Sequence, residues 1–186
     1  MRLRDLFAAS FLLVVSTLAH AASFNYNVND QFETFSVTGS LTSDINSGAL
    51  ATNDITDWNL TLNDGTQTLV ITPANSEELV LGSDLTATAS GLFFNFDSTA
   101  GGQFIFENPF IGSGTNYLCY QGKAGGCDDF TGAHESIDLG TAPRAIQSLS
   151  GNRQIASSVT PEPESLALMA TGLLGSVGIL RRRLAL

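Results

Sequence analysis

The chain has 186 residues and is acidic, with 18 Asp and Glu residues against 8 Lys and Arg and a formal net charge of −10. The imbalance is greatest in residues 22–160, which hold 15 of the acids but only three cations, Lys123, Arg144 and Arg153, for a net charge of −12. Such a surface repels nucleic acid, whose binding depends on Lys and Arg neutralising phosphates. It also disfavours anionic lipid headgroups and favours a soluble domain.

Residues 1–21 have the pattern of a secretory signal peptide. Arg2 and Arg4 give a positive start, residues 6–18 form an apolar run, and residues 19–21, Ala-His-Ala, supply the small-x-small pattern cleaved by signal peptidase. A first transmembrane anchor is the alternative, but the apolar run is short for a span. Both interpretations predict that the following residues cross the inner membrane.

Residues 22–156 predict a single all-β domain. Apolar residues alternate with polar ones, with Thr and aromatic enrichment, in residues 35–41, 58–62, 85–89, 92–96 and 104–106. This period of two is typical of half-buried antiparallel strands. Asn63-Asp64-Gly65 has the chemistry of a hairpin turn, and residues 98–102 separate two phenylalanine-rich strands in the same manner. The spacing predicts eight to ten short strands in an antiparallel β-sandwich, with a jelly roll as one form of it.

Cys119 and Cys127 lie close together in the exported part of the chain. An even cysteine count in an oxidising compartment predicts a disulfide, whereas a metal pair would need further ligands and has only His134 nearby. Residues 111–135 are glycine-rich and predict a long loop held by these cysteines. Tyr117 and Tyr120 flank Cys119 on that loop, and we expect them to be exposed and available for glycan contact.

Little in the sequence indicates catalysis. After signal-peptide removal His134 is the only histidine, and no Gly-x-Ser-x-Gly motif is present. We expect His134 to be a solvent-exposed loop residue, and Glu77-Glu78 to lie in a solvated turn. Trp58 alternates with Leu60 and Leu62, which favours a place in the core over a carbohydrate platform. The domain is therefore predicted to be non-catalytic and to need no cofactor.

Calcium is the metal that the composition would suit. Hard oxygen donors occur on predicted loops and strand ends, at Asp54, Asp57, Asp128 and Asp129. None of them matches the Asp-x-Asp-x-Asp-Gly calcium loop. We therefore interpret these residues as turn-forming and solubilising, and expect no metal.

The last residues combine three features in a fixed order. Residues 157–160 predict a short linker, and Pro161, Glu162 and Pro163 follow it. Residues 165–180 are uncharged and predict a single transmembrane helix of about 24 Å, at about 1.5 Å per residue. The cations at the end are Arg181, Arg182 and Arg183. They predict that this end stays cytoplasmic and that the β-domain lies outside.

Residues 160–183, which begin Thr-Pro-Glu-Pro-Glu-Ser, resemble the PEP-CTERM sorting domain. The resemblance implies recognition by an exosortase, a membrane-embedded cysteine transpeptidase of Gram-negative bacteria that make exopolysaccharide. It makes Pro161, Glu162 and Pro163 the recognition motif and the three arginines the cytoplasmic stop. The chain departs from the pattern at Glu164, where members often have a small residue.

The resemblance implies a precursor anchored in the inner membrane, whose mature form is transferred to the envelope or the exterior. Residues 39–44, 48–50 and 54–62 also resemble an uncharacterised group of exported β-domains, which implies no activity. We therefore expect a non-catalytic structural or interaction component of exopolysaccharide. The alternative is a glycan-binding adhesin, and an enzyme ranks third.

Overall fold

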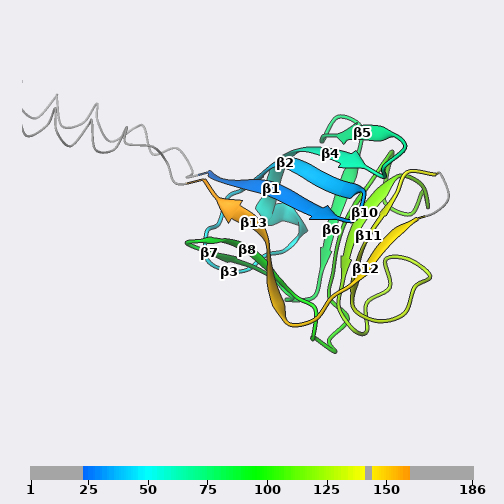
Figure 1. Ribbon diagram of the computed structural model, residues 1–186. Helices are drawn as coiled ribbons and strands as arrows, with labels where there is room; N and C mark the ends of the chain where they lie inside the picture. The colour runs from blue at the N-terminus through cyan, green and yellow to red at the C-terminus, as the bar shows by residue number, and fades with distance from the viewer. Residues whose placement is uncertain (1–22, 141–143, 160–186) are drawn as a thin grey trace, which may run out of the picture.

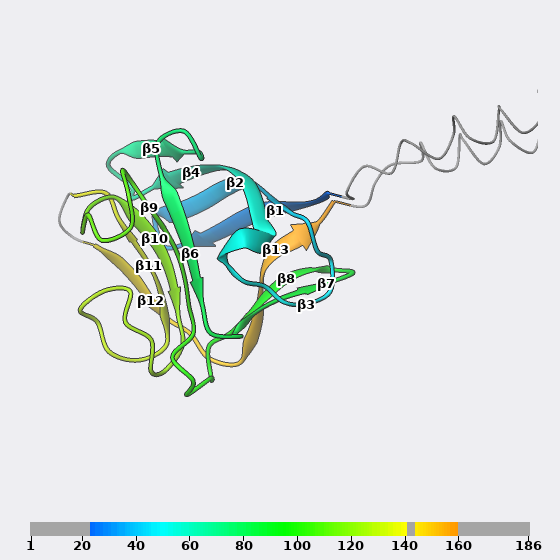
Figure 2. The ribbon, with the colours of Figure 1, turned by 180° about the vertical axis from the view of Figure 1, so that it is seen from behind.

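The strand patterns produce two antiparallel β-sheets that pack face to face (Figures 1 and 2). The computed structural model describes residues 23–140 and 144–159, and within these ranges the helical content is one 3-10 turn, η1 (Thr52–Asp54). The antiparallel β-sandwich predicted from the sequence is confirmed.

The larger sheet has eight strands and the smaller has five. In spatial order the larger sheet contains β3 (Gly48–Ala49), β7 (Leu85–Thr88), β8 (Gly91–Asn95), β13 (Asn152–Ser158), β1 (Phe24–Phe32), β2 (Phe35–Ser43), β4 (Ile55–Asn63) and β5 (Thr68–Ile71). The smaller sheet contains β12 (Ala145–Ser148), β11 (His134–Asp138), β10 (Tyr117–Gln121), β9 (Gln103–Glu107) and β6 (Glu77–Leu81).

Aromatic side chains join the two sheets in the core. Trp58 of β4 lies 5.4 Å from Phe106 of β9 between ring centroids, and Phe94 of β8 lies 6.2 Å from Tyr120 of β10. The indole nitrogen of Trp58 donates to the hydroxyl of Ser76 at 2.9 Å, so its polar atom is satisfied although the residue is only 9% exposed. The predicted place of Trp58 in the core is confirmed.

Several local expectations need correction. Residues 98–102 do not form a hairpin, because β8 and β9 belong to different sheets and the segment crosses between them. Glu77 and Glu78 lie in β6 rather than in a solvated turn. The last strand runs through Ser158, two residues beyond the predicted boundary, and residues 157–158 pair with β1 instead of forming a linker.

Loops cover the outer face of the smaller sheet. The carboxylate of Glu107, itself 4% exposed, accepts hydrogen bonds from the backbone of Gly112 at 2.7 Å and the hydroxyl of Ser113 at 2.9 Å. These bonds hold residues 108–116 against the end of β9. A second loop, residues 122–133, covers the other end of the same face and carries the disulfide.

Candidate functional site

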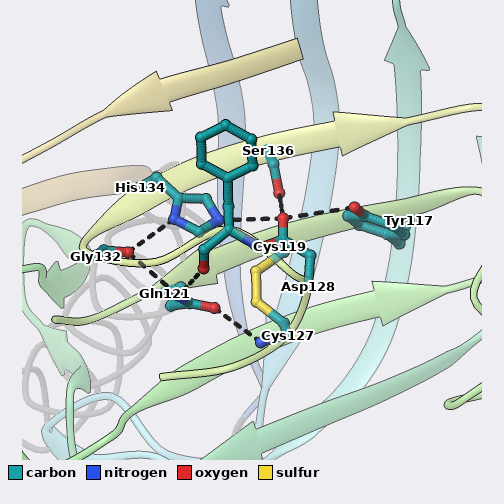
Figure 3. Close-up of a disulfide and its surroundings, with 9 residues drawn as sticks. Tyr117, Cys119, Gln121, Cys127, Asp128, Gly132, His134 and Ser136 are labelled. Carbon is teal, nitrogen blue, oxygen red and sulfur yellow. Dashed lines mark hydrogen bonds and ion pairs between the residues drawn. A yellow bond between two sulfur atoms is a disulfide. The ribbon is translucent and has the colours of Figure 1, made fainter. Parts of the chain in front are cut away.

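The predicted disulfide joins Cys119 on β10 to Cys127 in the loop that follows it (Figure 3). Gln121 reinforces this closure, since its amide oxygen accepts from the backbone of Cys127 at 2.8 Å and its amide nitrogen donates to the carbonyl of Phe130 at 3.1 Å. The disulfide and Gln121 together fix residues 122–133 over the outer face of the sheet.

Tyr117 and Tyr120 are buried, at 4% and 2% exposure, so the expectation that they are exposed is wrong. Residues 117–121 form a strand rather than part of a long loop, and the two tyrosines point to opposite faces because they are three positions apart along the strand. Tyr120 packs in the core against Phe104 at 5.9 Å, while Tyr117 lies under the covering loops. Neither side chain offers a surface to a glycan in this conformation.

A polar cluster lies beneath the disulfide loop, centred on Asp128 (Figure 3). Its Oδ2 atom receives hydrogen bonds from Ser136 Oγ at 2.9 Å and His134 Nε2 at 3.1 Å, and Tyr117 donates to it at 3.5 Å. The side chains of Asp128 and His134 are each 2% exposed. The expectation of a solvent-exposed His134 is therefore wrong, because the covering loop encloses it.

The cluster has the residue types of a catalytic triad but a different geometry. Ser136 and His134 both donate to the same oxygen of Asp128, so the serine proton is directed at the carboxylate and not at the imidazole. The other ring nitrogen of His134 lies 2.8 Å from the carbonyl of Gly132. A nucleophile needs a hydrogen bond to its base, and here the contacts instead connect the loop to β11.

A second polar feature lies on the inner face of the smaller sheet. Glu135 of β11 is fully buried, and neither of its carboxyl oxygens has a hydrogen-bond partner within the described residues. The pKa of Glu135 is raised to about 9, mainly by burial and in part by the nearby carboxyl of Asp30. The register places Glu135 opposite Tyr120 on one side and Gln147 on the other.

Glu78 is a similar case at the other end of the sheet. Burial raises its pKa to about 8, with a further contribution from Asp54. Glu78 is half-buried and Glu135 is fully buried, and neither position was expected from the sequence. The period of two in this strand could have predicted that Glu135 is buried, because Glu135 lies two residues from the apolar Ile137 and therefore on the same, inward face.

Two hollows lie along the line where β1 and β13 separate. One, of about 230 Å³, is lined by Asn27, Asn29, Gln154, Ile155, Ala156 and Ser157. The other, of about 260 Å³, is lined by Asp30, Gln31, Phe96, Gln147, Leu149, Arg153, Gln154 and Ile155. We call the pair the β1–β13 cleft. The strands expected from the sequence do not include β1, although its polar residues alternate with Tyr26 and Val28.

Across residues 23–140 and 144–159, no group of three or more His, Cys, Asp or Glu side chains is placed to hold a metal ion. The same ranges contain no helix of the length and hydropathy that a membrane span requires. The signal peptide at 1–21, the sorting motif at 161–163, the transmembrane helix at 165–180 and the arginines at 181–183 lie outside the described residues.

Comparison with known proteins identifies one functional element, at the C-terminal end of the chain. Residues 159–183 match the family model of the PEP-CTERM protein-sorting motif, and this range contains Pro161–Pro163 and the three arginines. No curated protein and no solved structure gives a significant match to the chain. The motif indicates an exported protein with a membrane-anchored precursor. Residues 159–183 thus carry a PEP-CTERM sorting motif, which indicates a protein that is sorted by an exosortase.

Proposed function

We propose that the β-sandwich is a non-catalytic component of the envelope or extracellular matrix, delivered by exosortase to work with exopolysaccharide. The observation that carries the proposal is the sorting motif at residues 159–183, joined to a single β-domain. Signal peptidase and exosortase are then its processing partners, and the inner membrane holds the precursor until its tail is removed.

The buried polar groups support a structural role. His134 and Ser136 both bond to Asp128 under a disulfide-closed loop, where a substrate has no access. Glu135 has no exposed surface from which to exchange a proton with a substrate directly. A disulfide-stabilised domain with an acidic surface suits an oxidising, aqueous compartment outside the cytoplasm.

Sorting is tested by changing Pro161, Glu162 and Pro163 to alanine. Export depends on the signal peptide and should continue, but the alanines favour a helix at the site that the enzyme must reach in extended form. We expect the wild type to be the shorter species outside the inner membrane and the variant to be the longer species within it. Glu164→Ala is the matched control, because it removes a neighbouring charge and leaves the motif intact.

The role in the matrix needs a separate measurement. The protein should be recovered with the extracellular polymer of the wild-type strain and should be lost to the medium in a strain that makes no exopolysaccharide. If both versions of the tail stay in the inner membrane at full length, the tail is only an anchor and the sorting proposal is wrong. Equal recovery from cells with and without exopolysaccharide would contradict the matrix role alone.

A glycan-binding adhesin is the second candidate function. The β1–β13 cleft favours it, because the cleft is open to solvent and lined by amide side chains.

A further inference from the structure

Three connections between strands meet beside the start of the disulfide loop. The first joins β6 to β7 and contains Asp84, and the second joins β8 to β9 and contains Ser98 and Gly102; both cross from one sheet to the other. The third begins at Gly122, directly after β10. Hydrogen bonds from Gly122 N to Gly102 O at 3.0 Å and from Lys123 N to Ser98 O at 2.9 Å join the last two connections. A crossing between the sheets is therefore tied to the loop that carries the disulfide.

Asp84 brings a carboxylate oxygen into this junction. The residue is 5% exposed, and its Oδ2 atom has no hydrogen-bond partner within residues 23–140 and 144–159. Its backbone is fixed, since the carbonyl oxygen of Asp84 accepts from Asn95 N at 2.9 Å. Isolated carboxylates are costly to bury, and buried charges in proteins are paired or coordinate metals. Oδ2 of Asp84 therefore needs a partner that the described side chains do not supply.

Two backbone carbonyl oxygens face the same space as this carboxylate. A Cβ atom built on Gly122 would lie 3.2 Å from Asp84 Oδ2, 3.2 Å from the carbonyl oxygen of Ser98 and 3.6 Å from that of Gly102. The three oxygens thus surround the position that a side chain at residue 122 would occupy, and we call them the Asp84 cradle. Both carbonyl oxygens already accept a backbone N–H, but each has a second lone pair that can bind a cation.

Glycine residues bring the backbone close to this carboxylate. A Cβ on Gly102 would lie 1.9 Å from Asp84 Oδ2, so a side chain there would displace the carboxylate. At Gly122 the φ angle is outside the left-handed region, so the backbone itself does not require glycine. A distance of 3.2 Å from carbon to oxygen is tight for a methyl group, whereas Ca²⁺ binds oxygens at about 2.3–2.6 Å. The position therefore suits an ion better than a side chain.

Solvent lies next to the cradle. Asp97 precedes Ser98 and Lys123 follows Gly122, and the side chains of Asp97 and Lys123 are 49% and 52% exposed. The ammonium of Lys123 lies 2.8 Å from the carboxylate of Asp97, so it pairs with that acid and not with Asp84. Water that completes the shell of a bound ion is thus one residue away from two of the three oxygens.

The donor set indicates which cation fits. Ca²⁺ prefers carboxylate and backbone carbonyl oxygens, takes about six to eight ligands and fills the remaining positions with water, whereas Mg²⁺ requires a stricter octahedron and loses its water reluctantly. Soft metals require thiolate or imidazole ligands, but Cys119 and Cys127 form a disulfide and His134 bonds to Asp128. The net charge of −12 over residues 22–160 attracts cations in general.

We propose that the Asp84 cradle binds a calcium ion, which ties both crossings between the sheets to the start of the disulfide loop. The sequence did not indicate this site, because two of its three protein ligands are backbone atoms. The acids considered as calcium ligands from the sequence were Asp54, Asp57, Asp128 and Asp129, which are not part of it. Extracellular calcium-binding modules have Kd values of about 10⁻⁴–10⁻³ M, which suits an exported domain. The proposal goes beyond the proposed function and does not depend on it.

Water is the competing occupant, because it would donate to Asp84 Oδ2 and to one carbonyl oxygen. A protonated Asp84 that donates to the carbonyl of Ser98 or Gly102 is the other alternative. Neither of them makes the stability of the domain depend on calcium. Unfolding with and without the ion therefore separates the alternatives from the proposal.

The exported protein is unfolded in urea at one pH and one ionic strength, with EDTA, with CaCl₂ or with MgCl₂. At about 10 mM calcium and a Kd in the range above, the unfolding equilibrium constant of the wild type should fall about tenfold to a hundredfold. Magnesium should lower it much less, because the cradle offers few ligands in a flexible arrangement. Calorimetry with CaCl₂ alone measures the binding directly.

Two variants remove the site in different ways. Asp84→Asn keeps the shape of the side chain and removes its charge. In EDTA it should be at least as stable as the wild type, because a buried carboxylate without a partner is gone, and calcium should no longer stabilise it. Gly122→Ala places a methyl group among the three oxygens and should also abolish the calcium response.

Each variant has a matched control that should keep the full calcium response. Asp44→Asn makes the same change at an exposed acid after β2. Gly126→Ala makes the same change in the same loop, where a Cβ would meet only Gln103 Nε2, at 3.8 Å.

The proposal is overturned if calcium stabilises the wild type no more than magnesium does, or if Asp84→Asn or Gly122→Ala keeps the full calcium response. An equal response in all five proteins would show that calcium only screens the negative charge of the domain. Lower stability of Asp84→Asn than of the wild type in EDTA would also overturn it, because the carboxyl would then have its partner without calcium. Tail removal and matrix recovery do not measure this site, so either proposal can fail without the other.

Discussion

Replacement of Glu135 by glutamine tests how a fully buried acid affects stability. Glu135 has no exposed surface and no hydrogen-bond partner in the described residues, and its pKa is raised to about 9. The groups that face it are Asp30 on β1, Tyr120 on β10 and Gln147 on β12. Glutamine keeps the size of the protonated carboxyl and cannot ionise.

The sign of the pH effect follows from proton counting. An exposed glutamate titrates near pH 4.3 in an unfolded chain, so between that value and about 9 the folded protein holds a proton that the unfolded chain has released. The free energy of unfolding therefore falls as pH rises through this window, by about 1.4 kcal/mol per unit from this group. From pH 5 to pH 8 the loss amounts to about 4 kcal/mol, as an upper value.

The assay is urea unfolding of the exported protein at pH 5, 6, 7 and 8. The wild type should lose stability with pH, and Glu135→Gln should remove most of that loss, so that the variant is the more stable protein at pH 8. Glu78, with a pKa of about 8, contributes in the same direction and is unchanged in both proteins. Glu33→Gln, in the exposed turn after β1, is the control. Parallel pH profiles for wild type and Glu135→Gln would refute the reasoning.

Three further changes test other contacts. Cys119→Ala combined with Cys127→Ser should lower the free energy of unfolding by about 2.5 kcal/mol, the loop-entropy value for a short closed loop. Mass spectrometry of the non-reduced wild type should show two hydrogens fewer than the reduced form. Thiol labelling of the wild type at these cysteines would contradict the disulfide. Gly39→Ala should lower the free energy of unfolding by more than about 2 kcal/mol, because φ is +141° and a Cβ would lie 2.0 Å from the carbonyl oxygen of Asn59. A variant as stable as the wild type in denaturant would contradict this prediction. Asp128→Ala should cost about 3 kcal/mol by leaving the three buried donors of Ser136, His134 and Tyr117 without their acceptor. Faster hydrogen exchange in residues 122–133 is a second readout, and unchanged exchange would show that the loop does not depend on Asp128.

The sequence alone determined the features that depend on local pattern. Strands with one buried face, such as β2 and β4, show alternation that can be read directly, and Trp58 was placed correctly because it alternates with Leu60 and Leu62. The sorting motif and the closure of the Cys119–Cys127 loop also depend on short stretches of chain. Each of these features can be recognised without knowing which segments are neighbours in space.

Only the tertiary structure decided which faces are covered. β10 is buried on both faces, so its sequence shows no alternation and was interpreted as part of a loop. The covering segments 108–116 and 122–133 enclose Tyr117 and His134. The pairing of Glu135 with Asp30 joins strands more than 100 residues apart in sequence. The β1–β13 cleft likewise exists because the first and last strands meet and then diverge. Burial, pKa and cleft shape depend on contacts between distant segments, and a local pattern does not contain them.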